Sequence, residues 1–66
     1  PNPVHDRLRI QGAAPNQPVR LLDALGREVR RTVAASTGEA TLDVAPLPPG
    51  VYVVQAGAAT RRVVVE

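Results

Sequence analysis

The chain has no cysteine, methionine, phenylalanine, tryptophan or lysine, and it carries one tyrosine and one histidine. The missing cysteines exclude disulfides, and a single histidine without cysteine falls short of the three or four ligands that a zinc site needs. The stability of these 66 residues must therefore come from a small core of aliphatic side chains in a single domain. We expect the isolated chain to be only marginally stable.

The basic residues are all arginine, and they exceed the acidic residues by a net charge of +2. They are spread along the chain between apolar residues. Nucleic-acid sites gather basic residues and add stacking aromatic rings, and the single ring here is assigned below to the fold. No apolar run approaches the roughly 20 residues that span a bilayer. The composition therefore indicates neither nucleic-acid binding nor membrane insertion.

The chain offers few residues for chemistry. His5 beside Asp6 is the single candidate for a metal or acid–base pair, and Ser36 is the only serine. A serine nucleophile needs a base and a group that orients the base, and Ser36 falls in a predicted turn with one histidine in the chain. We expect no catalytic, cofactor-binding or metal-binding residue, and no enzymatic activity.

Turn residues recur about every eight to twelve residues with short alternating runs between them, which is typical of an all-β sandwich or barrel. No segment has the pattern of a helix. The run 51–56 is apolar on both faces, which predicts a central strand. The predicted strands are Arg7–Ile10, Pro18–Asp23, Arg27–Ala34, Ala40–Val44, Val51–Ala56 and Ala59–Glu66, with Pro3–Val4 as a possible seventh.

Alternation within each run predicts which side chains face the core. These are Leu8, Ile10, Val19, Leu21, Val29, Val33, Leu42 and Val44. Arg31 falls on the same face as Val29 and Val33, which would bury a charge. We therefore expect a bulge near Arg30–Arg31 that turns Arg31 outward.

Two turns carry specific signals. The segment Leu47–Tyr52 places the only ring just after a Pro-Pro-Gly turn, which is the sequence form of a tyrosine corner. In such a corner the hydroxyl bonds to backbone a few residues upstream, where the chain crosses between two sheets. Asp23 and Gly26 are expected to make the tightest hairpin turn. Together these features predict a small immunoglobulin-like antiparallel β-sandwich of about six to seven short strands.

Four blocks follow one another with a characteristic order and spacing. They are Pro1-Asn2-Pro3-Val4 with Asp6, Leu8 and Ile10; Asp23 with Leu25-Gly26-Arg27 and Val29; Gly38 to Leu42 with Val44, Leu47, Pro49-Gly50 and Val51-Tyr52-Val53; and Thr60 to Val65. In these blocks the chain resembles the type A C-terminal sorting domain of the type IX secretion system, an outer-membrane export route of Bacteroidetes-type bacteria. The resemblance extends over essentially the full length.

The resemblance implies that residues 1–66 are a single C-terminal sorting domain, a fragment of a larger secreted protein with its passenger attached upstream. It implies recognition by the type IX machinery in the periplasm, delivery to the cell surface or medium, and removal by a surface sortase-like protease. The recognition candidates are Arg61, Arg62, Val63, Val64, Val65 and Glu66. The structural candidates are Pro1, Asn2, Pro3, Asp23, Gly26, Leu47, Pro49, Gly50 and Tyr52.

Other interpretations stay open. A passive immunoglobulin-like or fibronectin-like spacer or adhesion module fits the same pattern, and a stop codon directly after Glu66 would favour the sorting domain over the spacer. Carbohydrate binding is a weaker third choice, because sugar platforms generally need exposed aromatic rings. The final strand is open to two readings, as a core strand and as an edge strand that offers its backbone to a partner.

Overall fold

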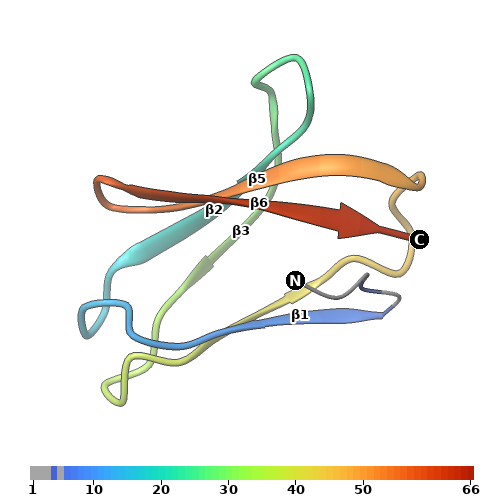
Figure 1. The fold of residues 1–66 in the computed structure, drawn as a ribbon. Coiled ribbons are helices and arrows are strands. Elements are labelled where there is room, and N and C mark those ends of the chain that lie inside the picture. The colour runs from blue at the N-terminus through green and yellow to red at the C-terminus, as the bar shows by residue number, and fades with distance from the viewer. Residues whose placement is uncertain (1–3, 5) are drawn as a thin grey trace.

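The computed structural model describes Val4 and residues 6–66, which form six β-strands and no helix (Figure 1). The strands are β1 (Arg7–Ile10), β2 (Pro18–Leu22), β3 (Glu28–Val33), β4 (Ala40–Asp43), β5 (Gly50–Ala56) and β6 (Ala59–Val65). All six predicted strands are confirmed, and their ends differ from the predicted ends by at most one residue. The alternating pattern in the sequence was therefore enough to locate every strand.

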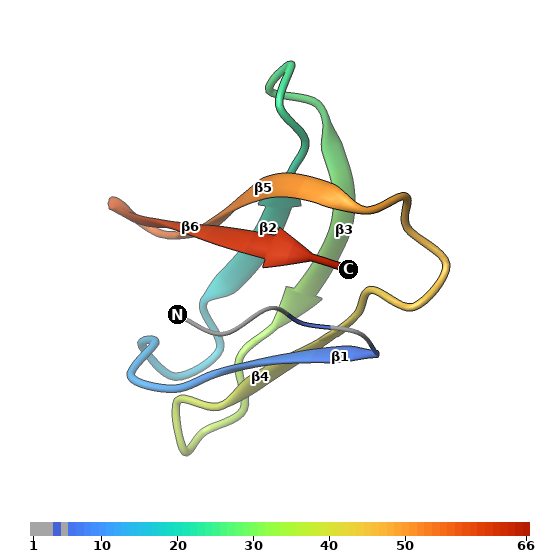
Figure 2. The same cartoon turned by 45° about the vertical axis from the view of Figure 1, so that its right-hand side comes forward.

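The strands form two antiparallel sheets. β1 and β4 make a two-stranded sheet, and the other four pair in the order β3-β2-β5-β6. Figures 1 and 2 show the two sheets as separate layers, and the chain passes between them after β1, after β3 and after β4. β5 lies between β2 and β6, which confirms the predicted central strand, and β6 lies at the edge of its sheet.

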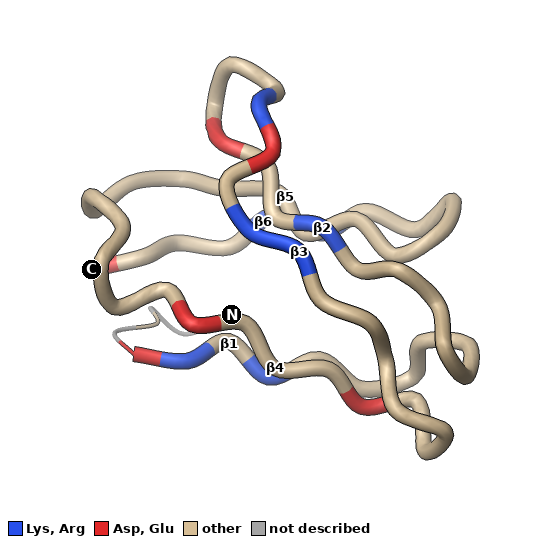
Figure 3. Tube along the Cα trace, turned by 180° about the vertical axis from the view of Figure 1, so that it is seen from behind, with Lys and Arg blue, Asp and Glu red and all other residues tan. Residues whose placement is uncertain are grey.

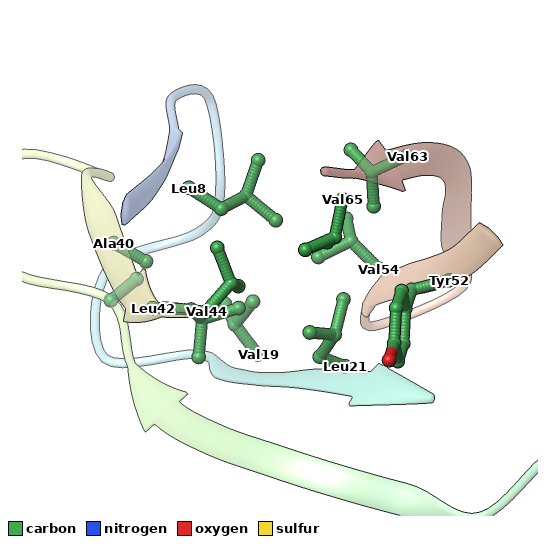
Figure 4. Packing of buried hydrophobic residues seen from close by; sticks show 11 residues of the cluster. Leu8, Val19, Leu21, Ala40, Leu42, Val44, Tyr52, Val54, Val63 and Val65 are labelled. Atoms are coloured by element: carbon green, nitrogen blue, oxygen red, sulfur yellow. The ribbon is translucent and has the colours of Figure 1, made fainter. Parts of the chain in front are cut away.

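The core lies between the two layers and is almost entirely aliphatic (Figure 4). Its buried residues are Leu8, Val19, Leu21, Ala34, Ala40, Leu42, Val44, Tyr52, Val54, Val63 and Val65. Five of the predicted core residues are among them, while Ile10 and Val29 are partly buried and pack against this cluster. No charged side chain of the described residues is buried. The interior is therefore held by packing of small side chains.

The pairing between β2 and β3 contains one irregularity, a shift of register that lies in β3. Leu21 pairs with Arg30, whereas Leu22 pairs with Glu28, so Val29 is the extra residue of a bulge. The sequence predicted a bulge near Arg30, and it lies one residue earlier. A bulge places two residues opposite one and disrupts the ladder locally.

The bulge changes which side chains of β3 face the core. Val33 is 57% exposed, so the prediction that it faces inward is wrong. Because an extra residue reverses the alternation that follows it, Arg31 and Val33 both turn outward and Ala34 turns inward, where it is buried. Arg31 is thus exposed as predicted, and Val33 is exposed instead of buried.

Two glycine turns of similar backbone differ in the space around them. Gly26 and Gly38 have φ values of 85° and 84°, which favour glycine. A Cβ atom at Gly38 would lie 2.6 Å from the carbonyl oxygen of Ala13, whereas a Cβ at Gly26 would meet nothing within 4 Å. The backbone amide of Ala13 also donates a hydrogen bond of 3.1 Å to the Gly38 carbonyl. The turn before β4 is therefore pressed against the loop before β2.

Replacing these two glycines by alanine should have unequal effects. Gly26→Ala should lower the free energy of unfolding by about 1–2 kcal/mol, the cost of a left-handed conformation in a residue with a Cβ. Gly38→Ala should lower it further, because the same strain is joined by a backbone contact that cannot relax locally. Urea unfolding followed by circular dichroism measures both. Equal losses would contradict the close approach of Gly38 to Ala13.

Candidate functional site

The recognition candidates 61–66 form the last five of the seven residues of β6 and the residue after it. β6 pairs with β5 along its full length, from Ala59 opposite Ala56 to Val65 opposite Gly50. Among the strands of the described residues, only β5 pairs with β6, so β6 is an edge strand of the four-stranded sheet. One side of its backbone is therefore directed away from the sheet.

Alternation along β6 divides the recognition candidates between the core and the surface. Val63 and Val65 are 6% and 1% exposed, and Figure 4 shows them inside the core cluster. Arg62, Val64 and Glu66 are exposed. β6 is therefore both a core strand and an edge strand, and its pairing with a partner stays a prediction. A partner that meets the folded module can touch only the exposed residues and the strand's edge.

Arg61 differs from the other exposed residues of β6. It lies directly opposite Val54, and directly opposite residues of an antiparallel pair face the same side of the sheet. Val54 is buried, so Arg61 projects from the inner face of the sheet. Arg61 is nevertheless exposed, and it lines a groove that opens between β1 and β6.

The end of β6 is tied to the start of the chain. The backbone amide of Val4 donates to the carbonyl of Val64, and the amide of Glu66 donates to the carbonyl of Val4, each at 2.9 Å. These bonds form a single parallel bridge between Val4 and Val65. The described part of the predicted seventh strand is thus one bridging residue. It fixes the backbone on both sides of Val65.

The described residues make three ion pairs, and none of them includes an arginine of β1 or β6. The pairs are Arg20 with Glu28 at 3.6 Å, Arg31 with Glu28 at 3.1 Å and Arg27 with Asp23 at 2.8 Å. Figure 3 shows the basic residues distributed over several strands and the β2–β3 hairpin. Within the described part of the chain, the charges of Arg61 and Arg62 are therefore left for solvent or for a partner.

Asp23 organises the β2–β3 hairpin, but the prediction that this is the tightest hairpin turn is wrong. Five residues connect β2 to β3, whereas two residues connect β5 to β6. Its Oδ1 accepts hydrogen bonds from the backbone amides of Leu25 and Arg27, each at 2.9 Å. Its Oδ2 accepts a bond of 2.8 Å from Nε of Arg27, and its backbone carbonyl accepts one from the amide of Gly26. The hydrogen bond from the Arg27 amide is the main cause that lowers the pKa of Asp23, with the Arg27 side chain and the Leu25 amide adding to it.

Tyr52 marks the crossing from β4 to β5. Its ring is 6% exposed and belongs to the core, and its hydroxyl donates a hydrogen bond of 2.6 Å to the backbone carbonyl of Pro48. Leu47 donates from its amide to the carbonyl of Val44 and packs against the core, while Pro49 is exposed and Gly50 begins β5. The side chain of Tyr52 thus ties the start of β5 to the last part of the crossing.

Several sequence predictions fall elsewhere. Pro1, Asn2, Pro3 and His5 lie outside the described residues. Among Val4 and residues 6–66, no three histidine, cysteine, aspartate or glutamate side chains come together as a metal site would require. No helix in that part of the chain has the length and apolar character to cross a membrane. Ser36 lies in an exposed turn between β3 and β4.

Sequence reasoning missed two residues beside the recognition strand. Val4 was considered as part of a short strand, but its partner, the end of β6, is 61 positions away and has no local signal. Arg9 alternates with Leu8 and Ile10, which by itself indicates only a solvent-facing position, whereas in the structure it lines the same groove as Arg61. Pairing of Val4 with a terminal strand is the kind of contact that an aligned set of sequences could reveal through covariation.

The fold and the site define a small all-β module whose last strand belongs to both the core and an open sheet edge. The family described as the secretion system C-terminal sorting domain matches residues 1–66. The chain belongs to this family and is a C-terminal sorting signal of type IX secretion. No curated protein and no solved structure matches the chain.

The family match confirms the resemblance that four sequence blocks indicated, and it favours a sorting signal over a passive spacer. A sorting signal acts on a passenger protein to which it is attached. Membership in this family therefore implies interaction with the type IX secretion machinery and export of the passenger to the cell surface or the medium.

Removing the Tyr52 hydroxyl should weaken the module without dismantling it. Tyr52→Phe keeps the buried ring and loses the bond to Pro48, so the free energy of unfolding should fall by about 1 kcal/mol. Urea unfolding measures this loss, with Leu25→Ala as a surface control that should stay within about 0.5 kcal/mol of wild type. A Tyr52→Phe protein as stable as wild type would show that the hydroxyl does not hold the crossing.

The Asp23 hairpin should make stability depend on pH in the acid range. The pKa of Asp23 is lower in the folded state than its ordinary value of about 3.9, so its contribution is present above that value. The contribution is lost as the pH falls through the lower folded-state pKa.

Asp23→Asn cannot carry the charge, so it should be less stable than wild type at neutral pH, and the difference should close as the pH falls into the acid range. Unfolding curves at a series of pH values for both proteins measure the difference. A difference that is unchanged across the series would mean that the charge of Asp23 does not stabilise the hairpin.

Proposed function

We propose that the chain is an export address read in its folded form, which the type IX machinery recognises after passage into the periplasm. The proposed contact strand is Arg61 to Glu66. The observation that carries this proposal is the burial of Val63 and Val65 in the core. Because two of the six residues of the contact strand are also core residues, ordering of the signal and folding of the module are the same event.

We further propose that the two sheets form an immunoglobulin-like sandwich. The sheet order β6-β5-β2-β3 corresponds to the G-F-C-C′ order of that fold, and β4 and β1 then take the places of strands E and B. Tyr52 near the start of β5 would be a tyrosine corner at the E–F crossing, which its hydrogen bond to Pro48 supports. Val4, bridged to β6, would represent what is left of strand A.

In this function, residues 1–66 would form one domain with no catalytic role of its own. Its passenger would be joined upstream, and a surface sortase-like protease would later separate the two. The bridge between Val4 and Val65 supports this arrangement, because it brings the entry of the chain beside the contact strand. Machinery that holds β6 would thereby also hold the connection to the passenger close to the membrane exit.

Export should require both the last strand and the fold that contains it. A periplasmically targeted fluorescent reporter fused ahead of residues 1–66 should reach the surface or medium of a bacterium with a working type IX system. The same fusion without Val63 to Glu66 should stay in the periplasm. Tyr52→Ala should stay there as well, because losing the buried ring costs roughly 3–5 kcal/mol in a marginally stable module.

Tyr52→Phe is the matched control for this experiment, since it keeps the ring and should be exported. Circular dichroism of each purified fusion partner establishes which variants are folded. A Tyr52→Ala module that is unfolded and still exported at the wild-type level would overturn recognition of a folded signal, and would indicate a linear one.

A further inference from the structure

A groove of about 270 Å³ opens between β1 and the β5–β6 hairpin. Its floor is the inner face of the four-stranded sheet, where Val54 and Val63 lie beside the small side chains of Ala56 and Ala59. Leu8 and Ile10 of β1 form the opposite wall. The groove exists because a sheet of two strands covers a sheet of four, so that no strand of the described residues covers this part of the larger sheet's inner face.

The groove is bounded by two sheet edges. β1 is an edge of the small sheet and β6 an edge of the large one. β1 has four residues, which at about 3.3 Å per residue span roughly 13 Å. Among the described residues, Val4 alone bonds to the outer edge of β6, at its far end. The shape and the two edges fit an extended segment of four or five residues.

The charge at the groove has one sign. Arg9 and Arg61 line it, and no acidic residue does. Neither arginine takes part in an ion pair among the described residues. Arginine presents a planar fork that binds carboxylates in a bidentate manner. Arg61 shares the inner face of the sheet with Val54 and Val63. The groove therefore selects a segment that carries a small aliphatic and an acidic side chain two positions apart, so that both lie on the face that meets the groove.

We propose that the β1–β6 groove receives an extended acidic segment of the export machinery, whose carboxylates bind Arg9 and Arg61 and whose aliphatic side chains cover Val54 and Val63. This inference rests on the proposed function and names the chemistry of the partner at the contact strand. The segment would add a strand beside β6, so that the machinery would complete the uncovered part of the sandwich.

A second copy of the chain is a poorer occupant of this groove. Pairing of two identical edges would bring the arginines of both copies together, and inward-pointing charges on edge strands are a known protection against such pairing. An acidic segment reverses the sign of that interaction. The same two arginines therefore exclude the chain's own edges and attract the partner.

Two peptides of eight residues test the charge preference, one that repeats Val-Val-Glu-Glu and one that repeats Val-Val-Lys-Lys, so that each face of the extended peptide carries both residue types. With the ¹⁵N-labelled 66-residue chain, the glutamate peptide should shift amide resonances of β1 and β6, and the lysine peptide should not. Arg9→Glu/Arg61→Glu should weaken binding of the glutamate peptide by about tenfold or more, and bind the lysine peptide instead.

Arg31→Glu is the matched control. Arg31 is exposed on β3, away from the groove, and its ion pair with Glu28 is a surface pair of small energetic value. This variant should bind the glutamate peptide within about twofold of wild type. Equal binding by wild type and the double variant, or shifts confined to other strands, would overturn the proposal. Shifts in β1 and β6 on dilution of the chain alone would assign the groove to a second copy and also overturn it.

The reporter fusion separates this inference from the proposed function. With Arg9→Glu/Arg61→Glu, the folded fusion should stay in the periplasm, while Arg31→Glu should be exported. If the double variant is exported normally and the fusion without Val63 to Glu66 is not, the groove is not the contact and the folded signal stands. If the fusion without these residues is also exported, the proposed contact strand itself is wrong.

Discussion

The crossing from β4 to β5 is the constraint on which the rest of the module depends. Tyr52 places its ring in the core and bonds its hydroxyl to the carbonyl of Pro48, which fixes where β5 enters the four-stranded sheet. β5 pairs with β2 on one side and β6 on the other, so its position sets the register of both.

The position of β5 determines the position of β6, because β6 has no other described strand to pair with. Val63 and Val65 close the core from β6, and the residues between and beside them face outward. Neighbouring residues at the end of β6 therefore lie alternately in the core and on the surface. A receptor that reads the exposed set in this arrangement reads folding at the same time, which would keep unfolded passenger fusions from being selected through this strand.

The strands were predictable because alternation is a local property, and the family was recognisable because its turn residues keep their spacing. The orientation of Val33 was not predictable from the sequence. It depends on the register between β2 and β3, in which Val29 is the extra residue of a bulge. The crowding of Gly38 was not predictable either, because it comes from the distant loop at Ala13. For Arg61, alternation already put it in phase with Val63, but its exposure follows from the width of the opposite sheet.

Because the two sheets have different numbers of strands, part of the inner face of the larger sheet borders an open groove. Arg9 and Arg61 at this groove determine which charge a binding segment must carry. Burying an unpaired guanidinium is costly, so Arg61 on the inner face keeps the groove from closing on the module itself. A free apolar edge of this length would otherwise favour pairing with any extended chain. With arginine at its opening, the edge favours only a chain that brings carboxylates. In the proposed docking, protection of the free edge and recognition by an acidic partner would depend on the same side chain.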